Sequence, residues 1–295
     1  MDNDNHSGQE THVWKVSFVR RLVNSAATVG MACAAILVVT PLVVIFGYLV
    51  YRGIGALNWS FLTQIPKPVG EPGGGMANGI VGSALILLIA SAIGIPLGIG
   101  SGVFLAEYGR NRYGDVVRFT ADVLNGVPSI VIGSTVWGLL VVTQKHFSLF
   151  SGAVALGIMM VPTVTRSTEE ILLMVPQSVR EAAIGLGISQ WRVTVSVVLR
   201  TATAGILTGI MLAFARVAGE TAPLMFTAFG NQFWSVSPNQ PAAALPLQIF
   251  YYATSAFEEL NRQAWAGALV LIVLIVGTIG IVRLVASRGL MKGAA

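Results

Sequence analysis

Two charged side chains and a threonine stand within an apolar stretch of the chain. The stretch covers residues 201–229 and contains Arg216, with Glu220 and Thr221 shortly after it. Bringing a guanidinium to membrane depth costs several kcal/mol, so Arg216 is expected to face the protein interior or a water-filled cavity. Its planar fork donates two parallel hydrogen bonds, which suits a tetrahedral oxyanion. The pattern therefore predicts an anion pathway lined by these three residues.

The same charges also have a structural interpretation. In a continuous helix, Glu220 lies one turn beyond Arg216 on the same face and can hold the guanidinium. That ion pair would fix the register of the helix without ever meeting a substrate. The residues alone favour neither interpretation over the other.

A polar segment, residues 176–199, separates two strongly apolar ones. Ser178 followed by Glu181 is typical of a helix start with a capping box. Glycines, the last of them Gly187, are expected to end this short helix, and Ser189 is expected to cap a second helix that runs into the next apolar stretch. The segment therefore predicts two helices joined by a turn, lying outside the bilayer.

The composition that surrounds these residues is that of an integral membrane protein. Of the 295 residues, 54% are hydrophobic and 11% are charged, and the mean hydropathy is +0.75. The single cysteine excludes an intrachain disulfide, and no cysteine or histidine pattern indicates a metal site. The formal net charge is +5, but its distribution indicates membrane orientation rather than nucleic-acid binding.

The apolar runs predict six transmembrane helices, because about 20 apolar residues in a helix cross a hydrocarbon core of about 30 Å. The segments outside the permease domain, 29–287, are a cytoplasmic N-terminal segment, 1–28, and a cytoplasmic tail, 288–295. The expected spans are about 29–50, 76–106, 119–143, 150–166, 201–229 and 265–285.

Three further features of these spans make structural predictions. Glycines recur at every fourth position at 94, 98 and 102, which favours close helix packing. Asp122 is expected to form an ion pair with Arg118, one helical turn before it. The fourth helix is expected to continue past the membrane through Glu170.

The basic residues predict the orientation. Leaving Arg216 aside, most of them fall in the N-terminal segment, the loop 107–118, the segment 166–200 and the tail, which all lie on one side if there are six spans. Cytoplasmic segments carry the excess of lysine and arginine. We therefore expect a multi-pass protein of the cell (inner) membrane with both termini and the polar segment in the cytoplasm. The other side holds only Arg52, Lys67, Lys145 and Arg262.

The polar segment resembles the EAA loop of ABC-importer permeases. Its EAAxxxG spacing is formed by Glu181, Ala182, Ala183 and Gly187. The resemblance implies a coupling helix that sits in a groove of a cytoplasmic ATPase, with the alanines and the glycine allowing close backbone approach. The family often has a proline where this chain has Arg200, at the start of the next helix. The alternative is that Glu181 only caps a helix and the spacing is chance.

A second resemblance covers the chain from about residue 70 to its end. The run 215–224, ARVAGETAPL, looks like the ARxAGETAPL signature of PstA-type phosphate-import permeases, and the runs LAEYG (105–109), PSIV (128–131) and NQFW (231–234) sit where that family has similar residues. The resemblance implies an all-α integral membrane protein with the ABC type I importer permease (MetI-like) fold. It has six transmembrane helices and a cytoplasmic coupling helix between spans 4 and 5.

The resemblance also implies a function and partners. The chain is expected to be the permease subunit of an ATP-driven phosphate importer, forming the pathway with a homologous PstC-type permease in the lipid bilayer. An extracytoplasmic phosphate-binding protein delivers phosphate, and an ATPase dimer holds the ATP and Mg²⁺. This chain is then not an enzyme, with no catalytic residue, metal or cofactor of its own. The alternatives are a permease for another oxyanion, such as sulfate or molybdate, and an ATP-independent anion carrier.

Overall fold

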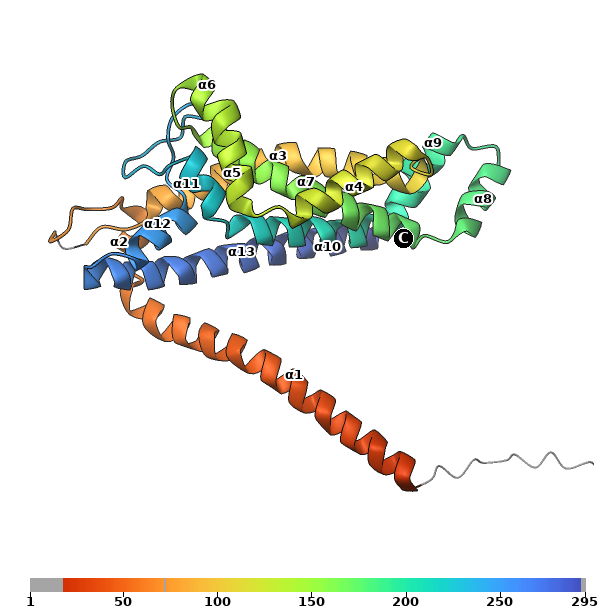
Figure 1. Ribbon diagram of the computed structural model, residues 1–295, viewed down its shortest axis with the longest axis horizontal. Helices are drawn as coiled ribbons and strands as arrows, with labels where there is room; N and C mark the ends of the chain where they lie inside the picture. Colours follow the sequence, from red (N-terminus) through yellow and green to blue (C-terminus); the bar gives the residue numbers. More distant parts are fainter. Residues whose placement is uncertain (1–17, 72, 293–295) are drawn as a thin grey trace, which may run out of the picture. The chain divides into compact units, whose positions relative to one another are not determined.

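The structure is a computed structural model that describes residues 18–71 and 73–292, the last six by their backbone alone. Within these residues every regular element is helical, apart from a single bridge between Phe229 and Ala242 (Figure 1). The expected all-α fold is confirmed. Most of the expected N-terminal segment, 1–28, and the end of the tail, 288–295, lie outside the described residues.

The chain divides after Val50 into two units. The described part of the first unit belongs to helix α1 (Phe18–Gly53), which is interrupted by no break although Pro41 lies inside it. The helix is long and apolar enough to cross a membrane. The second unit begins at Tyr51 and holds all the remaining elements.

The second unit contains the other long helices. Four of them are long and apolar enough to cross a membrane: Ala77–Glu107, Leu149–Leu173, Gln190–Ala218 and Glu258–Ala286. With α1, the described residues hold five candidate spans, or six if one bent pair of helices counts as a span. The short elements that precede the first of them are η1 (Ile54–Ala56) and α2 (Trp59–Thr63).

The bent pair replaces the third expected span. Helix α4 ends at Gly126, and α5 starts at Ser129 after a bend of 104°. Pro128 has no N–H to continue the helical ladder, and it holds Val127 in an extended conformation. The expected single helix over 119–143 is therefore two helices of different direction. The elements are α4 (Arg112–Gly126), α5 (Ser129–Val136), the π-helical turn η2 (Trp137–Val141) and α6 (Val142–Gln144).

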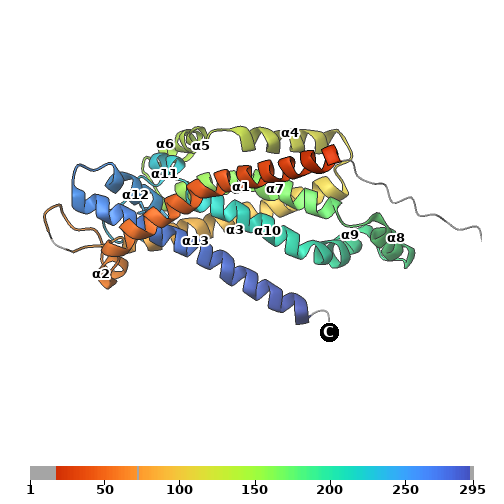
Figure 2. The same ribbon diagram turned by 90° about the horizontal axis from the view of Figure 1, so that it is seen from below.

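Helix α7 (Leu149–Leu173) is the central element of the second unit, and it continues through Glu170 as expected. It packs along α3 (Ala77–Glu107), as Figures 1 and 2 both show. A Cβ atom built at Gly98 would lie 2.6 Å from the Cβ of Val164, and one at Gly102 would lie 2.5 Å from the Cβ of Thr168. The glycines therefore permit the close helix packing that their spacing predicted.

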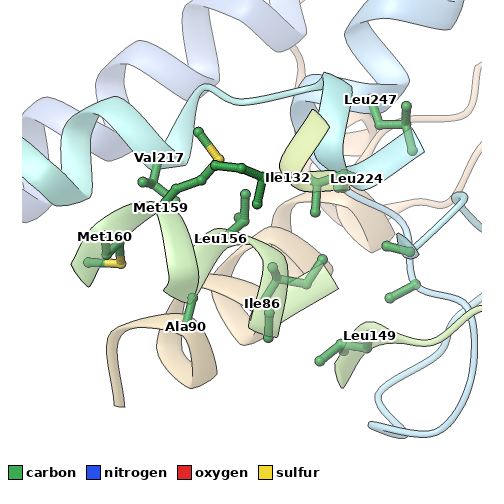
Figure 3. Packing of buried hydrophobic residues seen from close by; sticks show 14 residues of the cluster. Ile86, Ala90, Ile132, Leu149, Leu156, Met159, Met160, Val217, Leu224 and Leu247 are labelled. Atoms are coloured by element: carbon green, nitrogen blue, oxygen red, sulfur yellow. The ribbon is translucent and has the colours of Figure 1, made fainter. Parts of the chain in front are cut away.

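The main core lies between α7 and its neighbours. Leu156 and Met159 of α7 meet Ile86 of α3, Ile132 of α5 and Val217 of the helix that follows the polar segment (Figure 3). All five side chains are buried. Because Val217 directly follows Arg216, this packing holds the segment that carries Arg216 against α7.

The remaining elements follow α7. Gln190–Ala218 is one continuous helical rod with a π-helical turn inside it. It ends eleven residues before the expected end of the fifth span, residue 229, because Gly219 caps it and a separate helix, with Pro223 in its first turn, begins at Ala222. The elements are α8 (Gln177–Gly185), α9 (Gln190–Val193), η3 (Thr194–Val198), α10 (Leu199–Ala218), α11 (Ala222–Thr227), α12 (Leu245–Ala253) and α13 (Glu258–Lys292).

Candidate functional site

Arg216 lies in the last turn of α10, at a break between two helices. The next two residues, Val217 and Ala218, are buried in the core, whereas the Arg216 side chain is exposed. Glu220 and Thr221 form the connection to α11 and are half-buried. The three predicted pathway residues therefore lie at one helix break, and Arg216 is exposed at the surface of this chain.

The second interpretation, an ion pair between Arg216 and Glu220 on one helical face, is wrong. The helix ends at Ala218, so the two side chains do not share a helical face. Among the described residues neither side chain makes a hydrogen bond or an ion pair. The interpretation of Arg216 as half of an intrachain salt bridge therefore has no support in the structure, and the guanidinium is available to another group.

The polar segment forms two helices joined by a turn, as its residues predicted. Helix α8 starts at Gln177 after Pro176, and the expected capping box is wrong because Ser178 lies inside the first turn and makes no cap hydrogen bond. Ser189 does occupy the N-cap of α9, but its side chain also makes no such bond. Gly187 ends the turn after α8 with a φ of +80°, a left-handed conformation that favours glycine.

The residues of the EAAxxxG spacing differ in exposure. Glu181, Ala182 and Gly187 are exposed, so a partner can reach them. Ala183 is buried against Leu172 and other residues of a second core cluster. Ala183 therefore packs α8 against this chain, and only the other three residues of the spacing lie at the surface.

Arg180 anchors α8 to two other helices, and sequence reasoning missed this role. Its Nη2 lies 2.9 Å from Oε1 of Glu107 at the end of α3, and its Nε lies 3.2 Å from the same oxygen. Its Nη2 and Nη1 also donate to the carbonyls of Leu172 and Val175 at the end of α7. The only sign of this contact in the sequence is that Arg180 and Glu107 each lie at the border of an apolar run.

A second buried carboxylate lies nearby, at Glu169 of α7. Its oxygens accept from Arg118 Nε at 2.6 Å and from Arg166 Nη1 at 2.9 Å, and only 3% of the side chain is exposed. The expected ion pair of Asp122 with Arg118 is wrong. Asp122 instead pairs with Arg166, and Arg118 pairs with Glu169, which lies 51 residues further along the chain. Asp115 is a further partner of Arg118, at 3.3 Å.

A long apolar bundle with an amphiphilic two-helix turn and an arginine at a helix break fits a transport protein. Residues 94–290 match the family described as the binding-protein-dependent transport system inner membrane component. The match covers more than half of the chain, and the chain belongs to this family. The fold is also similar to that of the MetNI methionine ABC transporter in inward-facing conformations, with a TM-score of 0.54, 16% identity and coverage of 73% of this chain and 94% of that one.

Several relatives define the branch of the family. The chain is 47% identical over 258 residues to the phosphate transport system permease protein PstA of Xylella fastidiosa (strain Temecula1), covering 87% of this chain and 90% of the relative. It is 35% identical to PstA of Mycobacterium leprae, covering 89% and 88%, and 34% identical to the probable PstA of Methanocaldococcus jannaschii, covering 81% and 85%. The chain is of the PstA type, as the run ARVAGETAPL predicted.

Proposed function

We propose that this chain is the permease subunit of an ATP-driven phosphate importer, and that Arg216, Glu220 and Thr221 line the phosphate pathway. The observation that carries the assignment of the site is the exposed and unneutralised side chain of Arg216. It lies in the last turn of a helix long and apolar enough to cross a membrane, it is exposed, and no carboxylate of the described chain neutralises it. The similarity to PstA proteins of distant organisms supports phosphate as the substrate.

The exposed guanidinium also suggests where the pathway runs. A bare guanidinium facing acyl chains is costly, so its face of α10 needs either water or another protein surface. A homologous PstC-type permease that covers this face would enclose a hydrated pathway between the two chains. Phosphate, delivered there by an extracytoplasmic binding protein, would receive two parallel hydrogen bonds from Arg216 and one from Thr221. Glu220 would then repel the anion onward.

The energy is proposed to come from a partner on the cytoplasmic side. The exposed residues of the turn, Glu181, Ala182 and Gly187, are proposed to dock into an ATPase dimer that binds ATP and Mg²⁺. The apolar side chains of Leu186 and Trp191 are exposed beside them, which suits a protein partner. Both termini then lie in the cytoplasm with the turn, as the basic residues predict.

Uptake of labelled phosphate by proteoliposomes tests the proposal. The complete complex would be reconstituted with wild-type chain, Arg216→Ala, Arg216→Lys and a control, Thr203→Ala, whose side chain is also exposed but lies about 140° around α10 from Arg216. Arg216→Ala removes hydrogen bonds from a charged guanidinium that stabilise the bound anion by about 1.5–3 kcal/mol. Uptake should therefore fall by about tenfold to a hundredfold. The lysine variant should keep part of the uptake, and the control most of it.

Three results would contradict the proposal. Normal uptake by Arg216→Ala would remove this residue from the pathway. Equal competition by sulfate or molybdate would indicate a permease for another oxyanion. Uptake that continues without the ATPase would indicate a carrier of a different class.

A further inference from the structure

Arg180 is the one side chain of α8 that makes hydrogen bonds or ion pairs within the described residues. The other residues of the helix are exposed, except for Ala183 and the half-buried Val179. Apart from this apolar contact, α8 is therefore attached to the rest of the unit through a single guanidinium. That guanidinium belongs to the residue directly before Glu181, the proposed docking residue.

The attachment is buried and uses several donors. The Glu107 side chain is 6% exposed and the Arg180 side chain is 12% exposed. Together with the carbonyls of Leu172 and Val175, the carboxylate engages all three nitrogens of the guanidinium. A buried and fully bonded ion pair is costly to break because it leaves an uncompensated charge. The contact is therefore suited to stay closed while the helix is displaced.

The two helices that Arg180 grips are themselves joined. Their glycines allow close packing along the length of α3 and α7. At the same end Arg118 donates to Glu169 of α7 and to the carbonyls of Leu105 and Gly109, at 3.0 Å each, where α3 ends. A displacement of α8 would therefore reach α3 and α7 as one body.

The contact between α8 and the helical rod that carries Arg216 is of a different kind. Val179 and Ala183 of α8 share an apolar cluster with Val193 and Val198 of that rod, and the turn between the two helices, residues 184–192, is exposed. Among the described residues no side chain of α8 makes a hydrogen bond or an ion pair with the rod. The coupling helix is thus joined to α3 and α7 by a buried ion pair, and to the rod by apolar packing alone.

We propose that Arg180 and Glu107 are the positioning residues that transmit the displacement of the coupling helix to the α3–α7 pair. The core contacts of Leu156 and Met159 with Val217 would carry it on to the end of α10, where Arg216 lies. The inference rests on the proposed function, since it assumes that an ATPase displaces α8. It assigns a role to two residues that touch neither phosphate nor ATP.

The test measures coupling rather than transport alone. Complexes with Glu107→Gln, Arg180→Lys and Arg180→Gln would be reconstituted with the ATPase, the second permease and the binding protein, and phosphate uptake and ATP hydrolysis would be measured on the same proteoliposomes. Arg110→Gln is the matched control, because Arg110 lines the same cleft of about 420 Å³ beside Arg180 but makes no ion pair in the described chain.

The expected result is that the ATPase still co-purifies and still hydrolyses ATP. The phosphate imported per ATP should fall by about tenfold or more in Arg180→Gln, and less in Glu107→Gln and Arg180→Lys, which keep part of the hydrogen bonding. The control should keep the wild-type ratio. A purely structural role would lower uptake and hydrolysis together and leave their ratio unchanged.

An unchanged ratio in the variants that assemble would overturn the inference, and so would failure of all three variants to assemble. Failure of the wild-type complex to import phosphate would instead refute the proposed function. The two failures are therefore distinguishable in one set of measurements.

Discussion

Replacing Gly187 by alanine separates two reasons for a glycine in the turn after α8. The resemblance to the EAA loop implies that the glycine allows close approach of an ATPase. The structure adds that its φ of +80° is left-handed, where an L side chain is strained by about 1–2 kcal/mol. Space is not limiting, since nothing lies within 4 Å of the added Cβ.

Gly185 provides the matched control. It is the last residue of α8, it has no positive φ, and a Cβ added there also meets nothing within 4 Å. Gly185→Ala should favour the helix by about 0.5–1 kcal/mol. The two substitutions add the same atom to the same exposed turn and differ only in backbone conformation.

Hydrogen exchange of the isolated chain in detergent measures the effect without any partner. The amides of residues 186–188 donate to the carbonyls of residues 182–184, so they report the turn directly. A strain of about 1–2 kcal/mol should speed their exchange about 5- to 30-fold in Gly187→Ala. Gly185→Ala should exchange at the wild-type rate or more slowly, and Gly187→Asn should lie between the two alanine variants, because asparagine tolerates the left-handed conformation better.

Equal exchange in Gly187→Ala and Gly185→Ala would refute the strain argument. The glycine would then be explained by the ATPase alone, and the alanine variant should lose ATPase binding while its isolated turn stays closed.

Three further predictions concern the packing and charges around α7. Glu169→Ala should lower the free energy of unfolding by about 3–5 kcal/mol, because it leaves two arginines without their buried carboxylate; thermal unfolding in detergent would show it, and a loss below about 1 kcal/mol would contradict it. Asp122→Asn, at a pair whose carboxylate is 53% exposed, should cost no more than about 1 kcal/mol in the same assay, and a cost equal to that of Glu169→Ala would show that burial does not decide the difference. Gly98→Ala should cost about 1–3 kcal/mol by forcing Val164 away, whereas Gly100→Ala, which meets nothing within 4 Å, should not; similar stability of both variants would refute close packing at this seam.

The apolar runs predicted much of the fold. Hydrophobic stretches of sufficient length indicate where helices cross a membrane, and the structure has five or six such helices. Glycines spaced four apart predicted close helix packing, because only small residues allow such an approach, and the structure shows that the partner is α7. The φ of Gly187 agrees with the expectation that a glycine ends the first helix of the polar segment.

The helix breaks and the charge partners were harder to predict. Hydropathy does not distinguish one helix from two with an apolar break, so Pro128 was expected to lie inside a single span, and the end of α10 at Ala218 was missed. Arg180 and Glu107 are 73 residues apart, and no spacing rule connects them. The local rule for residues one turn apart instead suggested Arg216 with Glu220, which requires a continuous helix.

The lone guanidinium at the end of α10 has a consequence for biosynthesis. A subunit with an unneutralised cation at its surface has an unfavourable free energy in lipid until a partner subunit covers that cation. Surplus copies made without that partner would be exposed to membrane quality-control proteases. A cell that produces this chain therefore benefits from synthesising both halves of the pore in matched amounts.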